Sequence, residues 1–200
     1  MTTLVLASAS PARLATLRTA GVDPLVVVSG ADESGLEHLP PAQMAGQLAV
    51  RKADAVVRRG GLPDDALVLG CDSVLEVDGV AHGKPGTAEV ATRRWQQVRG
   101  RSGVLHTGHA LVHLAGDRST TAVASTVVHF ADVDDEEVAA YVATGEPLGV
   151  AGGFTLEGRG AAFVTGVEGD PHNVVGVSVP LLRTLCADLG LRWTDLWSPR

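Results

Sequence analysis

The pattern of apolar and polar positions predicts alternating strands and helices through the first part of the chain. Residues 4–7 form a short apolar run, which is typical of a buried strand, and lead into a Ser-rich loop. Pro11 then stands at a favoured first position of a helix, with Ser10 before it as the N-cap. A second apolar run follows at 25–28. A long amphipathic helix extends from the prolines at 40–41 to a pair of glycines.

The middle of the chain predicts antiparallel pairing. Residues 66–69 and 74–77 are apolar enough for strands, and the latter run into a hairpin turn at Asp78-Gly79. Two β-branched stretches at 104–114 and 120–130, separated by Gly and Asp, predict a second antiparallel pair.

Further helices complete the predicted elements. One begins at a Thr87 cap and ends near residue 98, and an acidic one begins near 134 and ends at Gly145. A Gly-rich segment precedes a strand at 162–167, and a final helix covers 180–189. We therefore expect one mixed α/β domain over residues 1–200, with a mixed sheet flanked by helices and two lobes around a cleft.

Charge and composition narrow the range of partners. The net charge of −7 repels polyanions, so we expect neither a nucleic-acid nor a membrane partner. Two distant cysteines, Cys71 and Cys186, suggest a reducing compartment. No apolar run approaches the ~20 residues of a membrane span, and no basic signal segment precedes the first strand. We expect a cytoplasmic protein, in which an anionic ligand would need locally concentrated positive charge.

The loop at 8–13, Ser-Ala-Ser-Pro-Ala-Arg, joins a strand to a helix N-terminus. Unpaired N–H groups at such an end bind anions, and the hydroxyls of Ser8 and Ser10 and the guanidinium of Arg13 would add donors for phosphate oxygens. Taken alone, the loop is better explained as an ordinary helix start.

Lysine is almost absent, with two lysines against fourteen arginines. The two that remain, Lys52 and Lys84, therefore suggest positions that require a compact, flexible ammonium. Lys84 lies in a Gly-Lys-Pro loop, from which it can reach a phosphate. Lys52 lies within the long predicted helix, where a surface cation is the ordinary alternative.

Two acidic residues lie beyond predicted strands. Asp72 directly follows a buried strand, and Glu33 lies in the loop after another. Together they would suit a hard divalent cation, and Asp72 would suit a general base acting on water. Without further context, Glu33 is better explained as a solvated loop acid.

Other residue patterns argue against alternative chemistries. Of His106, His109 and His113, only the last two would share one face of a strand, so a metal cluster is not expected. Cys71 has no local base and is better explained as a packed thiol. Neither a P-loop nor a dinucleotide-binding glycine motif is present.

The order of these motifs resembles that of the Maf-like proteins over nearly the whole chain. The matching motifs are Ser-Ala-Ser-Pro-Ala-Arg (8–13), Asp32-Glu33, Lys52, Cys-Asp-Ser (71–73), Gly-Lys-Pro (83–85), Thr107-Gly108, Glu146-Pro147 through Ala151-Gly152-Gly153-Phe154, and Gly169-Asp170 with Asn173-Val174-Val175-Gly176.

The resemblance implies a house-cleaning nucleoside triphosphate pyrophosphatase with an inosine-triphosphatase-like fold, dependent on Mg²⁺ or Mn²⁺ and often a homodimer. It implies that Asp72 accepts a proton from the attacking water and that Glu33 helps to hold the metal. Arg13, Lys52 and Lys84 would neutralise the triphosphate.

Departures from the family pattern concern the base of the nucleotide. Glu157 and Ser73 stand where the branch preferring dTTP and UTP carries Gln and Thr, and Ala12 replaces a basic residue. A carboxylate at 157 would accept hydrogen bonds from guanine, so the sequence favours a guanine-type substrate such as 7-methyl-GTP, with dTTP or UTP as the alternative. A nucleotide-binding regulator of cell division and septum formation, with little turnover, is the alternative of another class.

Overall fold

A mixed sheet forms the centre of the computed structural model, which describes residues 2–198. Its strands within that range are β1 (Leu4–Leu6), β2 (Leu25–Val26), β3 (Leu67–Val77), β4 (Val80–His82), β5 (Ser102–His113), β6 (Arg118–Phe130) and β7 (Val164–Glu168). The order is β2-β1-β3-β5-β6-β7, with β4 also paired to β3. β1 is parallel to β2 and β3, and the other pairings are antiparallel, which confirms the predicted mixed sheet.

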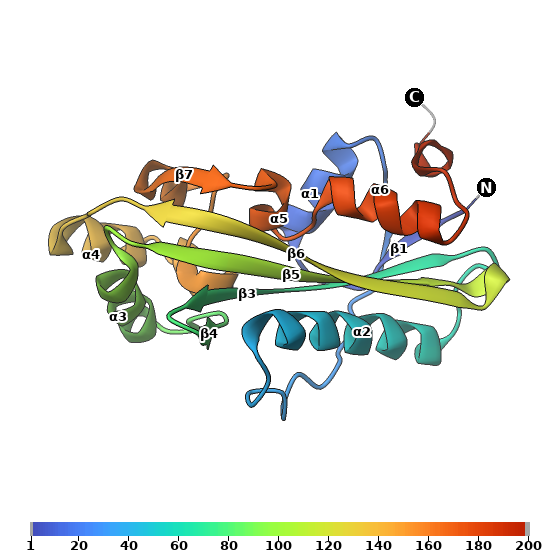
Figure 1. Cartoon of the computed structure of the whole chain (residues 1–200), viewed down its shortest axis with the longest axis horizontal. Coiled ribbons are helices and arrows are strands. Elements are labelled where there is room, and N and C mark those ends of the chain that lie inside the picture. The colour runs from blue at the N-terminus through green and yellow to red at the C-terminus, as the bar shows by residue number, and fades with distance from the viewer. Residues whose placement is uncertain (1, 199–200) are drawn as a thin grey trace.

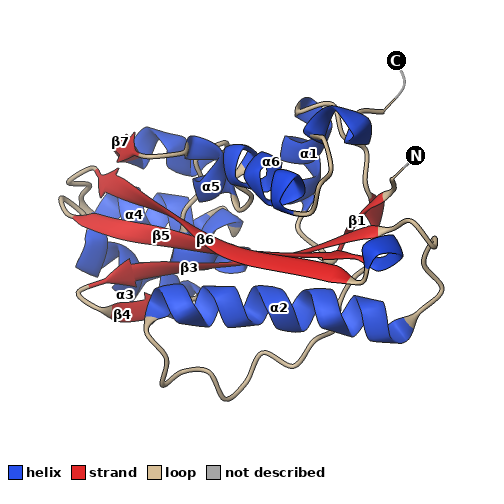
Figure 2. Ribbon diagram, turned by 45° about the vertical axis from the view of Figure 1, so that its right-hand side comes forward, coloured by secondary structure: helices blue, strands red, loops and turns tan. Residues whose placement is uncertain are grey.

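Helices cover both faces and one end of this elongated sheet (Figure 1). The α-helices are α1 (Pro11–Thr19), α2 (Pro41–Arg59), α3 (Ala88–Val98), α4 (Asp135–Ala143), α5 (Pro171–Val175) and α6 (Val179–Asp188). α2 lies along one face, while α1, α5 and α6 lie on the other (Figure 2). Short 3₁₀ helices occur at Leu114–Gly116, Glu146–Gly149, Ala151–Gly153, Arg159–Phe163 and Trp193–Leu196. Within the described residues, no helix is both long and apolar enough to cross a membrane.

Most predicted elements are confirmed, with three differences. The strands expected at 66–69 and 74–77 are one unbroken strand, β3. The strand expected at 162–167 begins only at Val164, because the preceding residues form a 3₁₀ helix. The short helix α5 was not predicted, although Asp170 before a proline is a typical N-cap and accepts a hydrogen bond from the backbone N–H of His172.

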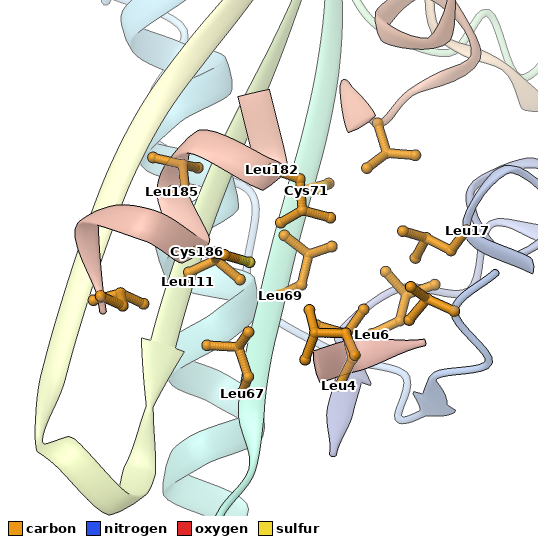
Figure 3. Packing of buried hydrophobic residues seen from close by; sticks show 14 residues of the cluster. Leu4, Leu6, Leu17, Leu67, Leu69, Cys71, Leu111, Leu182, Leu185 and Cys186 are labelled. Atoms are coloured by element: carbon orange, nitrogen blue, oxygen red, sulfur yellow. The ribbon is translucent and has the colours of Figure 1, made fainter. Parts of the chain in front are cut away.

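Alternation along β3 supplies two separate cores. Leu67, Leu69 and Cys71 point to the side of α1 and α6, where they pack with leucines of those helices (Figure 3). Val68 points to the opposite side and packs with small residues of α2. Consecutive residues of β3 therefore face different helices.

A third cluster closes the far end of the sheet. Trp95 of α3 makes edge-to-face contacts with Phe130, Tyr141 and Phe163. Its indole N–H donates to the carbonyl of Gly153 at 2.8 Å, so this buried ring has a polar partner. Five of the seven Phe, Tyr and Trp residues of the chain thus lie where α3 and α4 meet the sheet.

Two glycines allow α2 to lie directly on the sheet. A Cβ at Gly70 of β3 would lie 2.1 Å from the carbonyl oxygen of Ala49, and one at Gly108 of β5 would lie 2.1 Å from that of Ala45. Any side chain at either position would push the helix outward. This close approach determines the height of α2 above β3.

The buried His109 of β5 predicts a pH-dependent loss of stability. Its Nδ1–H donates to the carbonyl of Thr107, and Nε2 accepts the backbone N–H of Ser178, before α6. Burial is the main cause that lowers the pKa of His109 from 6.5 to about 4. His109 is therefore protonated below about pH 6.5 in the unfolded chain, but only below about pH 4 in the folded chain. Stability contributed by neutral His109 should fall across that window as the pH is lowered, by up to about 1.4 kcal/mol per pH unit.

Urea unfolding of the wild type and His109→Gln between pH 7 and pH 4.5 would measure this effect. We expect the stability advantage of the wild type to shrink as the pH falls. A constant difference between the two proteins across the range would contradict the assignment.

Candidate active site

A gap in the pairing of β3 locates the candidate site. On one edge, β1 pairs with residues 67–69 and β4 with residues 75–77, and within residues 2–198 no strand pairs with that edge between them. The chain leaves β1 here as the loop at 7–10, with the N–H of Ala7 donating to the carbonyl of Leu69. A pocket of about 420 Å³ lies beside the gap, at the carboxyl end of β1.

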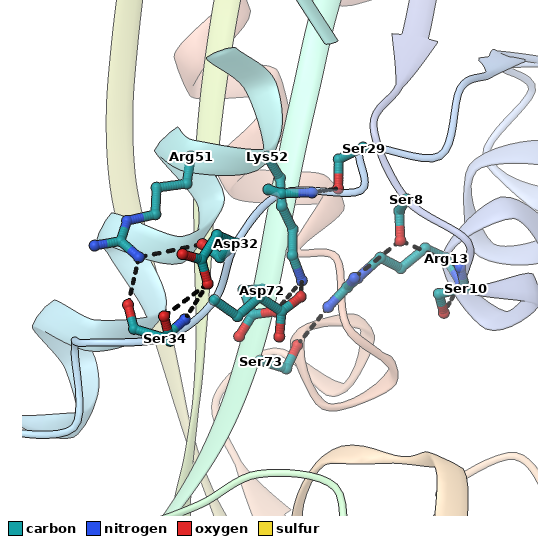
Figure 4. A network of polar contacts seen from close by, with 12 residues as sticks. Ser8, Ser10, Arg13, Ser29, Asp32, Ser34, Arg51, Lys52, Asp72 and Ser73 are labelled. Atoms are coloured by element: carbon teal, nitrogen blue, oxygen red, sulfur yellow. Dashed lines mark hydrogen bonds and ion pairs between the residues drawn. The ribbon is translucent and has the colours of Figure 1, made fainter. Parts of the chain in front are cut away.

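Successive side chains of β3 point to opposite faces of the sheet, so this pocket receives side chains from two different helices. Asp72 and Ser73 are consecutive on β3, and both line the pocket. Asp72 points toward α2 and meets Lys52, whereas Ser73 points toward α1 and meets Arg13 (Figure 4). The pocket therefore combines side chains from opposite faces of the sheet.

Lys52 joins the two predicted carboxylates. Its ammonium donates to Asp72 and lies 2.8 Å from Glu33. The side chains of Lys52 and Asp72 are only 11% and 13% exposed, so the explanation of Lys52 as a surface cation is wrong. Glu33 is 57% exposed but ion-paired, so it is more than a solvated loop acid. The two carboxylates converge on one cationic group.

The loop that carries Glu33 is fastened to α2. Arg51 donates to the carbonyls of Asp32 and Ser34, the residues on either side of Glu33, at 3.1 and 2.7 Å. Because Arg51 and Lys52 are neighbours on one helix, α2 both positions Glu33 and supplies its ion-pair partner.

Arg13 is buried beneath the loop at 7–10. Its Nε donates to the carbonyl of Gly176 at 2.7 Å, while Nη1 and Nη2 each donate at 3.0 Å to Ser8 and Ser73. These three bonds fix the plane of the guanidinium. They leave one N–H on each terminal nitrogen for another acceptor.

The two loop hydroxyls act as acceptors within the protein. Ser10 accepts from the backbone N–H of Arg13 at 3.3 Å, which confirms the predicted N-cap. Ser8 accepts from the backbone N–H of Ser10 and from Arg13. Both hydroxyl protons are left to donate, which suits an anionic ligand in the pocket.

Ser73 uses its hydroxyl to hold Arg13. The hydroxyl of Thr107 donates to the carbonyl of Asn173, so it must accept at 2.9 Å from Ser73. Ser73 in turn accepts from Arg13. Thr107 and Asn173 are not among the predicted site residues, although both belong to motifs shared with the family. Neither lines the pocket, so they act on it only through Ser73.

Lys84 and Glu157 lie at the exposed rim. Lys84 comes from the loop between β4 and α3, and no hydrogen bond or ion pair to its ammonium is present within residues 2–198. Glu157 accepts only the backbone N–H of Leu156 among the described residues. Phe154 also lines the pocket, although no local sequence pattern indicated it.

The discounted residues have structural partners. His106 bonds Ser125 and Glu76, and the described residues contain no group of three side chains suited to hold a metal ion. Burial is the main cause that raises the pKa of Cys71 to about 12, so its thiol stays protonated at neutral pH. His106 is thus held by hydrogen bonds, and Cys71 is a buried, protonated thiol.

The fold and pocket define a mixed α/β protein with a polar site beside a strand end, lined by basic and acidic side chains from several elements. The model of the family described as Maf-like protein matches residues 3–189. A protein of Streptomyces avermitilis is 55% identical over 98% of this chain and 95% of its own length, and one of Salinispora tropica is 56% identical over 98% and 87%. Both are named nucleoside triphosphate pyrophosphatase.

The chain belongs to the Maf-like family. Among solved structures, the Ham1 protein of Staphylococcus aureus aligns with a TM-score of 0.45 and 14% identity, over 66% of this chain and 73% of that one.

Proposed function

We propose that this chain is a nucleoside triphosphate pyrophosphatase that cleaves between the α- and β-phosphates, releasing a nucleoside monophosphate and pyrophosphate. Family membership and the names of the relatives support the reaction class. The observation that carries the proposal is the convergence of Asp72, Glu33 and Lys52 in one pocket beside the fixed guanidinium of Arg13. Such a site combines a base for water with charge for a polyphosphate.

In this proposal Asp72 accepts a proton from a water that attacks the α-phosphorus, and pyrophosphate leaves with the electrons of the broken P–O bond. Arg13 and Lys84 bind phosphate oxygens, as do the hydroxyls of Ser8 and Ser10. Lys52 moves from its carboxylate partners to the substrate. The protein contributes positioning and charge, the main requirements of phosphoryl transfer.

The balance of charged side chains in the pocket supports the binding of a divalent cation. The charged side chains that line it are three cations and three anions: Arg13, Lys52, Lys84, Glu33, Asp72 and Glu157. The expected excess of positive charge is therefore not present in the protein alone, while a triphosphate carries several negative charges. Glu33 and Asp72 already share a cation, Lys52, and their oxygens suit Mg²⁺ or Mn²⁺. When bound, such an ion would neutralise phosphate charge.

A nucleotide panel with Mn²⁺, assayed for pyrophosphate, tests the enzymatic proposal directly. We expect release from at least one nucleotide, with 7-methyl-GTP above dTTP and UTP. Binding without release from any nucleotide would instead support the regulator of cell division. The positioned pair of Asp72 and Lys52 favours the enzyme, because binding alone does not require a base.

We expect Glu157→Gln to lower the ratio of kcat/KM for 7-methyl-GTP to that for dTTP. The carboxylate at the rim can accept two N–H donors of guanine, whereas an amide offers one acceptor and one donor. The expected change is roughly ten-fold, the size of one hydrogen bond to a charged group. Glu168→Gln, outside the pocket, is the matched control, and an unchanged ratio in Glu157→Gln would remove residue 157 from base selection.

A cytoplasmic homodimer completes the proposal, on the ground of the family resemblance. Sedimentation of the purified protein would test the dimer.

A further inference from the structure

Glu146 is the acceptor of an unusual set of hydrogen bonds. It begins the 3₁₀ helix that follows α4, and its Oε1 accepts from the hydroxyls of Tyr141 and Thr155 and from the backbone N–H of Gly160. Its Oε2 accepts the backbone N–H of Arg159 at 3.1 Å. A single carboxylate thus has four donors, three of them from one short segment of chain.

That segment, residues 155–160, forms part of the pocket rim and is called the rim segment below. Thr155 and Glu157 both line the pocket. The donors to Glu146 lie on both sides of Glu157, with Thr155 before it and Arg159 and Gly160 after it. Glu146 therefore fastens the rim segment at both ends of the part that carries Glu157.

The rim segment fits closely around the carboxylate. A Cβ at Gly158 would lie 2.7 Å from Oε1 of Glu146, and one at Gly160 would lie 2.4 Å from the hydroxyl of Tyr141. Glycine at these positions allows the backbone to approach its acceptor.

Only an ionised carboxylate satisfies all four donors. Burial on its own would raise the pKa of Glu146. Hydrogen bonds from Thr155, the backbone of Gly160 and Arg159, and Tyr141 outweigh it and lower the pKa to about 2. An amide would present an NH₂ group to one of these donors.

We propose that Glu146 is a positioning residue for base selection, which holds the rim segment so that Glu157 stays at the pocket. The inference rests on the proposed function. In this inference Glu146 does not contact the substrate. It affects base selection only through the position of the rim segment, and it plays no part in binding phosphate.

The test compares Glu146→Gln, Tyr141→Phe and Val138→Ala with the wild type. Tyr141→Phe removes one donor from outside the pocket and serves as a milder variant should Glu146→Gln fold poorly. Val138 is a buried residue of α4 in the aromatic cluster, so Val138→Ala reduces packing without removing a bond to Glu146. Each protein is assayed for KM and kcat on 7-methyl-GTP and dTTP, and for hydrogen exchange of the amides at 159 and 160.

For Glu146→Gln we expect faster exchange at both amides. We also expect a roughly ten-fold rise in KM for 7-methyl-GTP, a smaller change in kcat, and a lower preference over dTTP. Tyr141→Phe should shift the same quantities less, and Val138→Ala should leave the preference unchanged.

Two results would overturn the inference. Unchanged KM and preference in both Glu146→Gln and Tyr141→Phe would do so, as would an equal shift in Val138→Ala. If the wild type itself releases no pyrophosphate from any nucleotide, the proposed function fails and the inference with it. The first two results leave the proposed function intact, so the failures are distinguishable.

Discussion

Replacing Asp72 with asparagine should lower kcat by roughly 10²–10⁴-fold, the usual contribution of a general base. Asparagine has the same shape, and its carbonyl can still accept a hydrogen bond from Lys52, which remains paired with Glu33. It lacks a group basic enough to take a proton from water. The loss should therefore appear mainly in turnover.

Steady-state assays with the preferred nucleotide, together with titration of a non-hydrolysable analogue, would separate turnover from binding. Asp64→Asn, in the exposed loop before β3, is the control for a neutralised aspartate and should retain wild-type turnover. A kcat near that of the wild type in Asp72→Asn would exclude Asp72 as the base.

Gly70→Ala should destabilise the protein by about 3 kcal/mol or more, because a buried backbone contact leaves the new methyl group no space. The added Cβ would lie 2.1 Å from the carbonyl oxygen of Ala49 and 2.8 Å from the backbone nitrogen of Ala53. Backbone atoms within a helix cannot yield as a flexible side chain can. The whole of α2 must move away from β3, which would also separate Lys52 from Asp72.

Thermal and urea unfolding would measure this loss, and activity of the folded fraction would report the displaced Lys52. Gly83→Ala is the matched control, since a Cβ there meets no atom within 4 Å and the loop has no positive φ at that position. A Gly70→Ala protein as stable as Gly83→Ala would show that α2 does not rest on β3 as described.

Most elements and their order could be predicted from local patterns along the chain. Apolar alternation, helical spacing and helix-end signals are local, and the predicted caps Ser10 and Thr87 each accept the expected backbone hydrogen bond. The same patterns predicted a mixed sheet with an antiparallel portion after the alternating strands and helices, and the structure has such a sheet. The periodicity and the helix ends were predictable because the interactions that determine them lie within a few residues of each other.

The loop at 8–13 illustrates the limit of local patterns. Its helix start was predictable, but alone it gave no reason to expect a pocket. Only the ordered set of motifs resembling the Maf-like family indicated that distant residues would meet, and the structure brings Arg13, Lys52 and Asp72 into one pocket.

The three-dimensional arrangement of the chain determines the partners of these side chains. It buried Lys52 between two carboxylates, assigned the hydroxyl of Ser73 to Arg13, and surrounded Glu146 with donors of the rim segment. Arg13 and Ser73 are 60 residues apart, and Thr107 meets the carbonyl of a residue 66 positions away. No local pattern specifies such partners, because their proximity depends on strand register and on the height of α2 above the sheet.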